Sequence, residues 1–323
     1  MTPFAVAIVN YNTREHLRAC LTTVQPEAPS EMVVVDNASS DGSVEMVQAN
    51  YPRVILCANK VNLGYGPAAN QAVARCTTKY ALLLNSDTLL QPGALQALAA
   101  YLDSHPRAAI VGPRLVNPDG TPQVSCYPFP TPLNTFLGNT TLSRLISYVP
   151  ALRNHYLPTW PHTSARVVPW VKGAALALRR EAFEAVGGFD ESFFMYSEET
   201  DLCFRLSAAG WQVYFAPVTT VVHTGAASTT QLRTDMAVQF FVSLRKFYQR
   251  HYSRTRLAEL VVIVKSIMLA RWLIDMARLN STHDTTKRAM IAADVAAWQH
   301  VLLGHWREQV NCSSQKGEQW NNR

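Results

Sequence analysis

Acidic and imidazole side chains stand at the ends of predicted strands, where they could support metal-assisted chemistry. Asp87 follows the apolar run Tyr80–Leu84, and His223 ends a later apolar run. A divalent hard cation held by such side chains can neutralise the charge of a departing diphosphate. We therefore take Asp87 and His223 as candidate metal ligands, with Asn85 near enough to reach the metal, a water or a ribose. Each has a structural alternative, because Asn-x-Asp often forms a turn and a histidine at a strand end is often part of the core.

A second acidic cluster, Ser197-Glu198-Glu199-Thr200-Asp201, lies at a predicted helix start. A carboxylate there can act as the general base that takes a proton from an attacking hydroxyl. We favour Glu199 for this role, because crowded like charges keep the pKa of one carboxylate from falling too far. Glu198 and Asp201 have an equally simple structural interpretation. Acids suit the first turn after a serine cap, and Asp201 is spaced to pair with Arg205.

A glycine-rich segment, Asn62-Leu63-Gly64-Tyr65-Gly66, precedes a predicted helix. Glycine permits close approach of a ligand to the backbone, and a helix N-terminus favours phosphate. The alternative is an ordinary glycine-rich start of a helix.

The elements that must position these side chains alternate between strand and helix over the first hundred residues. Short, continuous apolar runs are typical of strands buried on both faces, and their alternation with helices predicts a largely parallel sheet. The expected strands are Phe4–Val9, Met32–Val35, Val54–Cys57 and Tyr80–Leu84. The expected helices are Thr13–Val24, Asp41–Asn50 (capped by Asp41 or Ser43), Gly66–Cys76 and Gly93–His105.

Three of these strands end in polar clusters: Asn10-Tyr11-Asn12, Asp36-Asn37-Ala38-Ser39 and Asn85-Ser86-Asp87. In open α/β sheets, ligands bind in the crevice outside the carboxyl ends of the strands. We therefore expect the three clusters to meet at one binding edge.

The second half of this region is less regular. The proline-rich segment from Pro113 to Pro169 predicts a long excursion over the binding face. After it we expect a strand over Trp170–Leu178, helices over Arg180–Val186 and from about Ser197, and closing strands over Val213–Phe215 and Thr219–Val222.

Beyond Gln231 the chain is predicted to be helical and basic. Between Arg233 and Arg256, six cations stand against one acid, a net +5 of the chain's +6. An apolar helical stripe runs through Phe240, Phe241, Leu244, Phe247 and Tyr248. The following run, Ala258–Leu279, is interrupted by charged residues, among them Lys265, Arg271, Asp275 and Arg278, and so is too polar to span a bilayer. These helices either dock on an anionic membrane surface or pack on the rest of the chain or in a homo-oligomer.

Size and composition fit one large domain with an appendage. The chain has 323 residues, of which 48% are hydrophobic, and we divide it into an α/β domain (1–230), a helical extension (231–310) and a disordered tail (311–323). Six scattered cysteines without a CxxC pair argue against a disulfide framework and favour a reducing compartment. The N-terminus reads as a strand rather than a signal peptide, which predicts a cytoplasmic location, with docking on the cytoplasmic face of the inner membrane. Because the positive charge is local, no nucleic-acid partner is expected.

Taken in order, the motifs resemble glycosyltransferase family 2, which has the GT-A fold, and within it the bacterial rhamnosyltransferase-like branch. The likeness runs through most of residues 4–230. Its blocks are Val9-Asn10-Tyr11-Asn12, Val34–Ser43, Asn62–Asn70, Leu84-Asn85-Ser86-Asp87, Lys172-Gly173, Gly187–Phe194, Glu198–Arg205, Ala209-Gly210-Trp211 and His223-Thr224-Gly225.

The resemblance implies a role for each matching position. Asp36 matches an acid that contacts the nucleobase, and around the same nucleotide pocket lie Asn10, Asn12, Ser39, Asp41, Asn62 and Gly64. Asp87 matches the last acid of a metal-binding DxD-type motif, and His223 matches a later metal ligand. Gly173 lies where sugar or acceptor approaches the backbone, Glu199 matches the general base of an "ED" pair, and Trp211 belongs to a core pattern near the donor.

Two positions depart from the family pattern. Asn85 stands where many relatives have Asp, which leaves one carboxylate and predicts weaker metal binding. Glu199 stands where the base is usually Asp; the extra methylene moves the carboxylate by about 1.5 Å, and errors near 1 Å can cost about 10²-fold in rate. Either the acceptor pocket is reshaped around Glu199, or Glu198 is the base.

The sequence therefore predicts an inverting transferase that uses Mg²⁺ or Mn²⁺ and a dTDP- or UDP-sugar, with rhamnose favoured by resemblance. Its acceptor would be a hydroxyl of a glycan or lipid-linked glycan. A nucleotidyltransferase shares the fold and metal, but the segment Asn10–Thr13 lacks the glycine-rich loop that would hold a triphosphate. A nucleotide-sugar-binding scaffold without turnover is the other alternative, motivated by Asn85 and Glu199.

Overall fold

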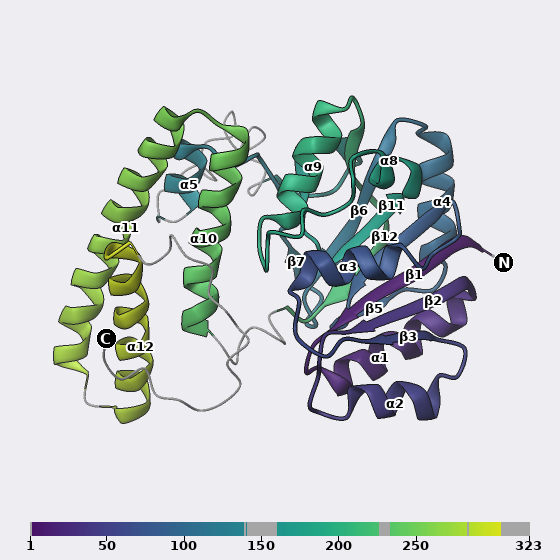
Figure 1. Cartoon of the computed structure of the whole chain (residues 1–323), viewed down its shortest axis with the longest axis horizontal. Helices are drawn as coiled ribbons and strands as arrows, with labels where there is room; N and C mark the ends of the chain where they lie inside the picture. The colour runs from purple at the N-terminus through teal and green to yellow at the C-terminus, as the bar shows by residue number, and fades with distance from the viewer. Residues whose placement is uncertain (1, 139, 141–159, 226–232, 283, 305–323) are drawn as a thin grey trace.

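A computed structural model describes residues 2–138, 140, 160–225, 233–282 and 284–304. Its centre is a ten-stranded sheet with the main order β3-β2-β1-β4-β11-β6-β12-β5 (Figure 1). The main strands are β1 (Thr2–Asn10), β2 (Pro29–Asp36), β3 (Ile55–Ala58), β4 (Tyr80–Asn85), β5 (Thr88–Leu90), β6 (Ala108–Val116), β11 (Ala175–Arg179) and β12 (Gln212–His223). Two short strands complete this sheet: β7 (Pro122–Gln123) pairs with β6, and β9 (Arg166–Val167) pairs with β12. A separate two-stranded sheet is formed by β8 (Cys126–Tyr127) and β10 (Trp170–Val171).

The expected parallel ladder is confirmed for β3, β2, β1 and β4. From β11 onward the sheet is mixed, because β11 runs antiparallel to both β4 and β6, whereas β6 and β12 are parallel. The register places Asn10 opposite Asp36, and Val9 opposite Asn85. The three polar clusters therefore meet at one edge of the sheet, as predicted.

Both faces of the sheet are covered, which explains the continuous apolar runs. Along β1, alternate residues enter two separate cores: Ala5, Ala7 and Val9 on one face, and Phe4, Val6 and Ile8 on the other. The first face is covered by α3 (Tyr65–Val73), α8 (Arg180–Ala185) and α9 (Glu198–Ala208). The second is covered by α1 (Arg14–Val24), α2 (Ser43–Asn50) and α4 (Ala94–Ser104).

Three local expectations differ from the structure. The predicted strand Trp170–Leu178 is divided into β10 and β11, because the segment 172–174 turns toward the binding edge. The two predicted closing strands are one strand, β12, with a register shift between Phe215 and Thr220. Neither Asp41 nor Ser43 takes the cap position of α2, which belongs to Gly42 in the left-handed region. The Asp41 carboxylate instead accepts hydrogen bonds from the backbone and side chain of Ser43.

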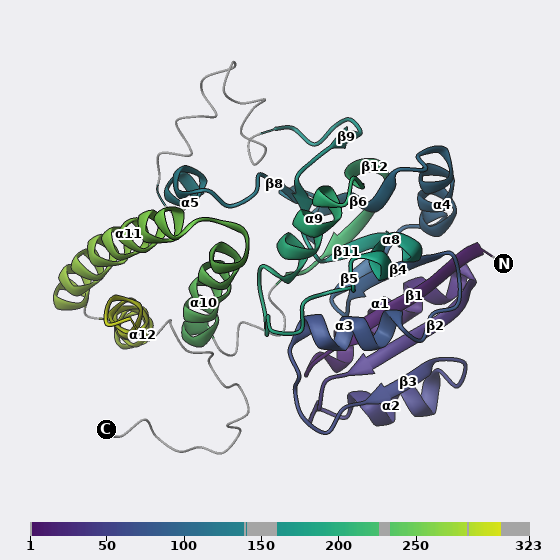
Figure 2. The same cartoon turned by 45° about the horizontal axis from the view of Figure 1, so that its top comes forward.

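The C-terminal helices form a third core with α5 (Pro132–Gly138). They are α10 (Arg233–His251), α11 (Arg254–Ser281) and α12 (Thr285–Leu302). Helix α10 lies between the sheet and the α11–α12 pair in both views (Figures 1 and 2). The apolar stripe of α10 is buried apart from Phe240, so for this helix packing is the interpretation that holds.

Several sequence expectations fall at the limits of the described residues. The expected boundary between residues 230 and 231 and the tail 311–323 both lie outside them. Within the described helices, none is long and apolar enough to cross a membrane. The five cysteines that fall within the described residues are free, and four of them are buried.

Gly64, at the start of α3, fits against the loop before α9. Its φ is +86°, and a Cβ at this position would lie 2.3 Å from the carbonyl oxygen of Phe194. Gly93 has a similar φ of +80° but has nothing within 4 Å of such a Cβ. The two glycines differ in backbone as well as in contact: with a ψ of 175°, Gly64 lies in a region that is essentially restricted to glycine, whereas Gly93, with a ψ of 8°, lies in the left-handed helical region.

We expect Gly64→Ala to destabilise the protein more than Gly93→Ala. Gly93→Ala must place a Cβ in the left-handed region, which costs about 1–2 kcal/mol, and Gly64→Ala must place one in a region essentially restricted to glycine, which costs on the order of 1–3 kcal/mol. Only Gly64→Ala must also displace backbone, and such overpacking adds ~1–3 kcal/mol. Free energies of unfolding from urea titrations measure the difference. Equal losses would show that the contact between Gly64 and Phe194 does not constrain the fold.

Candidate active site

A pocket of about 330 Å³ opens at the edge where the strands end. Strand ends, the segment 172–174 and the start of α9 all contribute to it. The lining comprises Val9, Tyr11, Asn37, Asn62, Gly64, Tyr65, Asn85, Ser86, Asp87, Lys172, Gly173, Ala174, Met195, Tyr196, Glu198, Glu199 and His223. The two candidate metal ligands and both candidate bases therefore share one cavity.

Asp87 and His223 meet because β5 and β12 are neighbours. Asp87 lies in the tight turn between β4 and β5, and the pairing of β5 with β12 places His223 opposite Thr88. The backbone N–H of Thr224 donates to the carbonyl of Asp87 at 3.0 Å, which fixes the turn. His223 Nε2 then lies 3.5 Å from Asp87 Oδ1, with both side chains buried.

Gln123 sets the tautomer of His223. Its Nε2 donates to Asn117 Oδ1 at 2.8 Å, so its Oε1 faces the imidazole. The distance from His223 Nδ1 to Gln123 Oε1 is 2.6 Å, which makes Nδ1 the protonated nitrogen. Nε2 consequently carries its lone pair toward Asp87. Burial lowers the pKa of His223, which keeps the imidazole neutral.

This arrangement fits a divalent cation. In this tautomer a lone pair on Nε2 faces a carboxylate oxygen at 3.5 Å, and both are donor atoms that could bind one metal ion. A hydrogen bond on the remote imidazole nitrogen is the usual support of a histidine ligand. Among the described residues no group of three or more His, Cys, Asp and Glu side chains gathers around a common point. Protein ligands would therefore fill only part of a coordination shell, leaving room for ligand oxygens.

Glu199 faces the cavity from the first turn of α9. It packs against Gly173, where a Cβ would lie 3.6 Å from Glu199 Oε1. Burial raises the pKa of Glu199, while a backbone hydrogen bond from Gly173 and the charge of Lys172 limit the rise. Glu199 Oε2 is left without a hydrogen-bond partner among the described residues. A raised pKa and a free oxygen are what a general base needs.

Glu198 is more enclosed than Glu199. It is 5% exposed, whereas Glu199 retains surface toward the cavity. Burial, and then the charge of Glu199, holds the pKa of Glu198 well above its usual range. No cation of the described residues offsets this effect, so Glu198 is the more readily protonated of the two.

The pocket is dominated by negative charge. Three carboxylates, those of Asp87, Glu198 and Glu199, all act on the buried hydroxyl of Tyr65 and help to raise its pKa, after burial itself. Lys172 is the lining residue with opposite charge, and it donates to Gln123 Oε1 at 3.1 Å. A diphosphate entering such a pocket would be repelled unless a cation came with it.

Five predicted nucleotide-site residues form a polar layer beside the pocket rather than its lining: Asn10, Asn12, Asp36, Ser39 and Asp41. Both carboxylate oxygens of Asp36 are engaged: Oδ2 accepts from Asn10 Nδ2 at 2.8 Å and Oδ1 from the Ser39 backbone at 2.8 Å. Asn12 has a left-handed φ of 51° and accepts from the Ser40 backbone.

Asn37 connects this layer with the glycine-rich segment. Its Nδ2 donates to Asn62 Oδ1 and to the carbonyl of Gly64, each at 2.9 Å. Asn62 and Gly64 thereby become part of the lining, as expected. The roles of all these residues toward a nucleotide stay predictions.

Asp201 and Trp211 are structural. Asp201 is fully buried and binds Arg205 at 2.7 Å, so the predicted i, i+4 pair is present. Trp211 packs partly buried against the core on the α9 side. Ser197 occupies the cap position of α9 with φ +63° and makes no capping hydrogen bond through its side chain, contrary to its expected use as a cap.

Several residues of the site were not singled out from the sequence: Tyr65 and Lys172 line the pocket, and Gln123 contacts His223 without being part of the lining. Tyr65, whose hydroxyl donates to the carbonyl of Gly173 at 3.2 Å, stands inside a recognised motif, which was a usable signal. Lys172 does so as well. Gln123 comes from the proline-rich excursion, 100 residues away from His223, and no local pattern marks it.

Family comparisons agree with this geometry. The sequence model described as "Glycosyl transferase family 2" matches residues 5–151, and "Glycosyl transferase family group 2" matches residues 80–277. The N-acetylglucosaminyl-diphospho-decaprenol L-rhamnosyltransferase of Mycobacterium tuberculosis is 33% identical over 241 residues, covering 69% of this chain and 76% of that one. Rhamnosyltransferase WbbL of Escherichia coli is 25% identical over 227 residues, covering 68% and 82%.

Solved structures agree on the fold. A mannosyltransferase from Pyrobaculum calidifontis, solved with GDP-Man and Mn²⁺, aligns with a TM-score of 0.51 at 18% identity over 95% of this chain and 88% of its own. GalNAc-T7, solved with UDP, GalNAc and Mn²⁺, aligns with a TM-score of 0.51 at 17% identity over 68% and 42%. The fold is thus of the expected GT-A type, and the chain, with its rhamnosyltransferase-like sequence, belongs to glycosyltransferase family 2.

Proposed function

We propose that this glycosyltransferase moves a sugar from a dTDP- or UDP-sugar to a hydroxyl of a glycan or lipid-linked glycan, with inversion and with the help of Mg²⁺ or Mn²⁺. The observation that carries the proposal is the buried Asp87–His223 pair, in which Nε2 of His223 faces Asp87 Oδ1 at 3.5 Å while Nδ1 is bound by Gln123. Glu199 lines the same pocket.

Asp87 and His223 would hold the metal ion between the protein and the donor diphosphate. When bound, the cation would neutralise the charge that builds on the leaving nucleotide diphosphate. Gln123 keeps His223 Nε2 unprotonated for this purpose, and Lys172 adds a second positive charge near Asp87. The negative pocket explains why the donor would enter together with its metal. Asn85 contributes an amide rather than a second carboxylate, so we expect the free protein to bind the metal weakly.

Glu199 would be the general base. Its carboxylate takes the proton of the acceptor hydroxyl as the acceptor oxygen bonds to the anomeric carbon and the bond from that carbon to the diphosphate oxygen breaks. A single displacement of this kind inverts the anomeric carbon and needs no covalent enzyme intermediate. We prefer Glu199 to Glu198 because Glu199 has surface in the cavity and is oriented by the Gly173 backbone.

The sugar and the acceptor are inferred from the relatives. Two of them are named rhamnosyltransferases, and the name of one places its acceptor on a decaprenol diphosphate. We therefore propose rhamnose as the transferred sugar and a lipid-linked glycan as the acceptor.

A scaffold that binds nucleotide sugars without turnover is the competing function, supported by Asn85 and Glu199 at positions where relatives often have Asp. The buried, unpaired Oε2 of Glu199 favours catalysis, because a carboxylate with no chemical task has no reason to keep an unsatisfied buried oxygen. A nucleotidyltransferase finds less support, since Asn10 and Asn12 are engaged within the polar layer and no glycine-rich loop follows β1.

We expect Glu199→Gln to abolish turnover while leaving donor binding intact. The amide cannot accept the proton, so kcat should fall by about 10²–10⁴-fold. The correct donor, chosen by thermal shift with and without Mn²⁺, should stabilise both proteins alike, by about 2.7 kcal/mol at 100 times its Kd. Glu181→Gln, an exposed acid at the start of α8, is the matched control.

The pH dependence of kcat/KM is a second test of Glu199 as the general base. Because the pKa of Glu199 is raised, kcat/KM should fall as the pH drops through that raised value, above the usual range of a glutamate. Donor binding without any transfer or hydrolysis, unchanged in Glu199→Gln, would instead establish the scaffold.

We also propose that the protein docks on an anionic membrane surface, at the cytoplasmic face of the inner membrane, and that α11 rather than α10 makes the contact. Val262, Leu269, Leu273 and Ile274 of α11 are between 48 and 64% exposed. The helix carries five cations, Arg254, Arg256, Lys265, Arg271 and Arg278, against the acids Glu259 and Asp275. Exposed apolar side chains among cations are typical of helices that lie in a bilayer interface.

The double substitution Leu269→Glu, Leu273→Glu should weaken binding to vesicles of phosphatidylglycerol by at least about tenfold. The reason is that burying each leucine side chain in the bilayer interface contributes more than ~1.5 kcal/mol to the free energy of binding. Val218→Glu is the control, since Val218 is an exposed apolar residue on β12. Cosedimentation at low and high salt measures the effect. If wild type ignores vesicles but forms oligomers that the double variant dissociates, α11 is a homo-oligomer interface instead.

A further inference from the structure

The turn that leads into α9 is strained. Tyr196 and Ser197 both have left-handed backbones, with φ of 66° and 63°, and they directly precede Glu198 and Glu199. Non-glycine residues in this region cost on the order of 1–3 kcal/mol each, and they persist only where the surrounding structure holds them. The position of both carboxylates therefore depends on whatever holds this turn.

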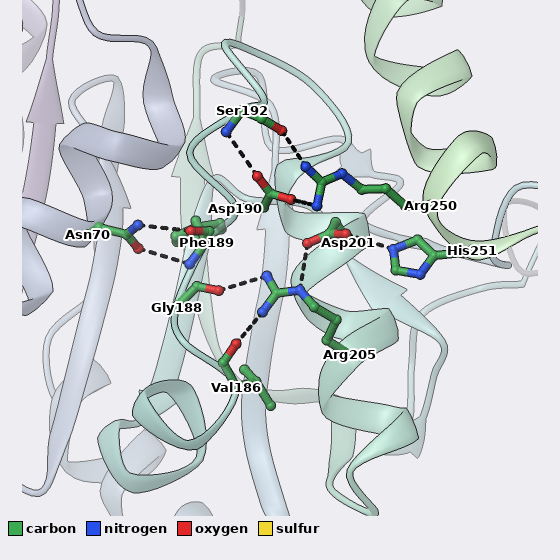
Figure 3. A network of polar contacts seen from close by, with 10 residues as sticks. All are labelled: Asn70, Val186, Gly188, Phe189, Asp190, Ser192, Asp201, Arg205, Arg250 and His251. Carbon is green, nitrogen blue, oxygen red and sulfur yellow. Dashed lines mark hydrogen bonds and ion pairs between the residues drawn. The ribbon is translucent and has the colours of Figure 1, made fainter.

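One side of the turn is held by α10. Ser243 donates to the carbonyl of Met195 at 2.6 Å. Earlier in the same loop, Lys246 donates to the carbonyl of Ser192, and Arg250 binds both the Asp190 carboxylate and, at 3.0 Å, the Ser192 hydroxyl. Figure 3 shows Arg250 reaching from α10 to this loop.

The last residue of α10, His251, contacts α9 directly. His251 Nε2 lies 2.7 Å from Asp201 Oδ1, and the Asp201 side chain is 1% exposed. Asp201 Oδ2 accepts from Arg205 Nε at 2.7 Å, and Arg205 in turn donates to the carbonyls of Val186 and Gly188 (Figure 3). His251 thus anchors a buried carboxylate that lies two residues after Glu199.

On its other side, the loop is hydrogen-bonded to α3, next to the pocket. Asn70 on α3 exchanges two hydrogen bonds with the backbone of Phe189, and Tyr65 N–H donates to the carbonyl of Phe194 at 2.8 Å. The loop is therefore held between α3 and α10. Without the contacts of α10, only one side of it would remain fixed.

We propose that His251 is a positioning residue that, through Asp201, fixes the first turn of α9 and so aims Glu199 at the reacting centre. The proposal rests on the function proposed above. It makes α10 a working part of the active site, although none of the described side chains of α10 lines the pocket.

The first experiment compares His251→Leu with His251→Gln and Gln249→Ala. Leucine fills the space beside Phe204 and Phe247 but cannot donate a hydrogen bond to Asp201, whereas glutamine can. Gln249→Ala is the control, because Gln249 is an exposed neighbour on α10. We expect His251→Leu to lower kcat by about 10–100-fold, as displacements near 1 Å do, with donor KM changed less than about twofold. His251→Gln should restore much of the loss, and Gln249→Ala should match wild type.

A second readout needs no turnover. Burial raises the pKa of Glu198 in the folded protein. As the pH rises above the pKa of a glutamate in the unfolded chain, ionisation of Glu198 therefore destabilises the folded state. Glu198→Gln should therefore stabilise the protein more at a pH of about 8 than at about 5. In the His251→Leu background this pH-dependent gain should shrink, because the released turn lets Glu198 reach water.

The two readouts separate the outcomes. Wild-type kcat in His251→Leu together with an undiminished gain from Glu198→Gln would overturn the positioning role. If wild type transfers no sugar, the proposed function fails, and the stability measurement still decides whether His251 fixes the turn. Should His251→Leu not fold, Ser243→Ala removes the contact with Met195 and is expected to give the same pattern in milder form.

Discussion

The structure depends on the concentration of negative charge in one small pocket. Asp87, Glu198 and Glu199 enclose a space in which Lys172 is the opposing lining charge, and two of the carboxylates keep an oxygen without a partner. Removing such groups from water is costly, so a fold retains them only where they have a task. A cation bound at one side of the pocket and a proton taken up at the other would reduce this cost. Glycosyl transfer requires both, a cation to neutralise the leaving diphosphate and a carboxylate to take the acceptor proton.

The fold produces this arrangement by bringing distant segments to one sheet edge. Parallel pairing of β1, β2 and β4 aligns three polar strand ends, and antiparallel β5 and β12 bring Asp87 and His223 together. The carboxylates come from the opposite wall, at the start of α9, so the metal side and the base side are supported by separate elements. Gln123 orients the first, while Gly173 and α10 orient the second.

The sequence predicted what depends on local pattern and missed what depends on long-range contact. Apolar periodicity and strand-end polarity indicated β1 to β4, the binding edge, Asp87 and His223, and the acidic cluster at a predicted helix start indicated Glu199. No local pattern marks Gln123, which meets His223 from the irregular excursion, or the pairing of His251 with Asp201 across 50 residues. The stripe on α10 was correctly identified as apolar, but periodicity cannot tell a buried stripe from one that faces a membrane. The left-handed turn at Tyr196 and Ser197 was equally hidden, because neither residue type signals a positive φ.

The central claim, that Asp87 and His223 together hold a divalent cation with the nucleotide diphosphate, is tested most directly by Mn²⁺ binding. Electron paramagnetic resonance of free Mn²⁺, titrated with protein in the presence of UDP or dTDP, measures the affinity without any need for turnover. We expect binding by wild type that is weakened about 10–100-fold in both Asp87→Asn and His223→Gln, as loss of a ligand or its support does elsewhere. Equal Mn²⁺ affinity in wild type and both variants would contradict the account.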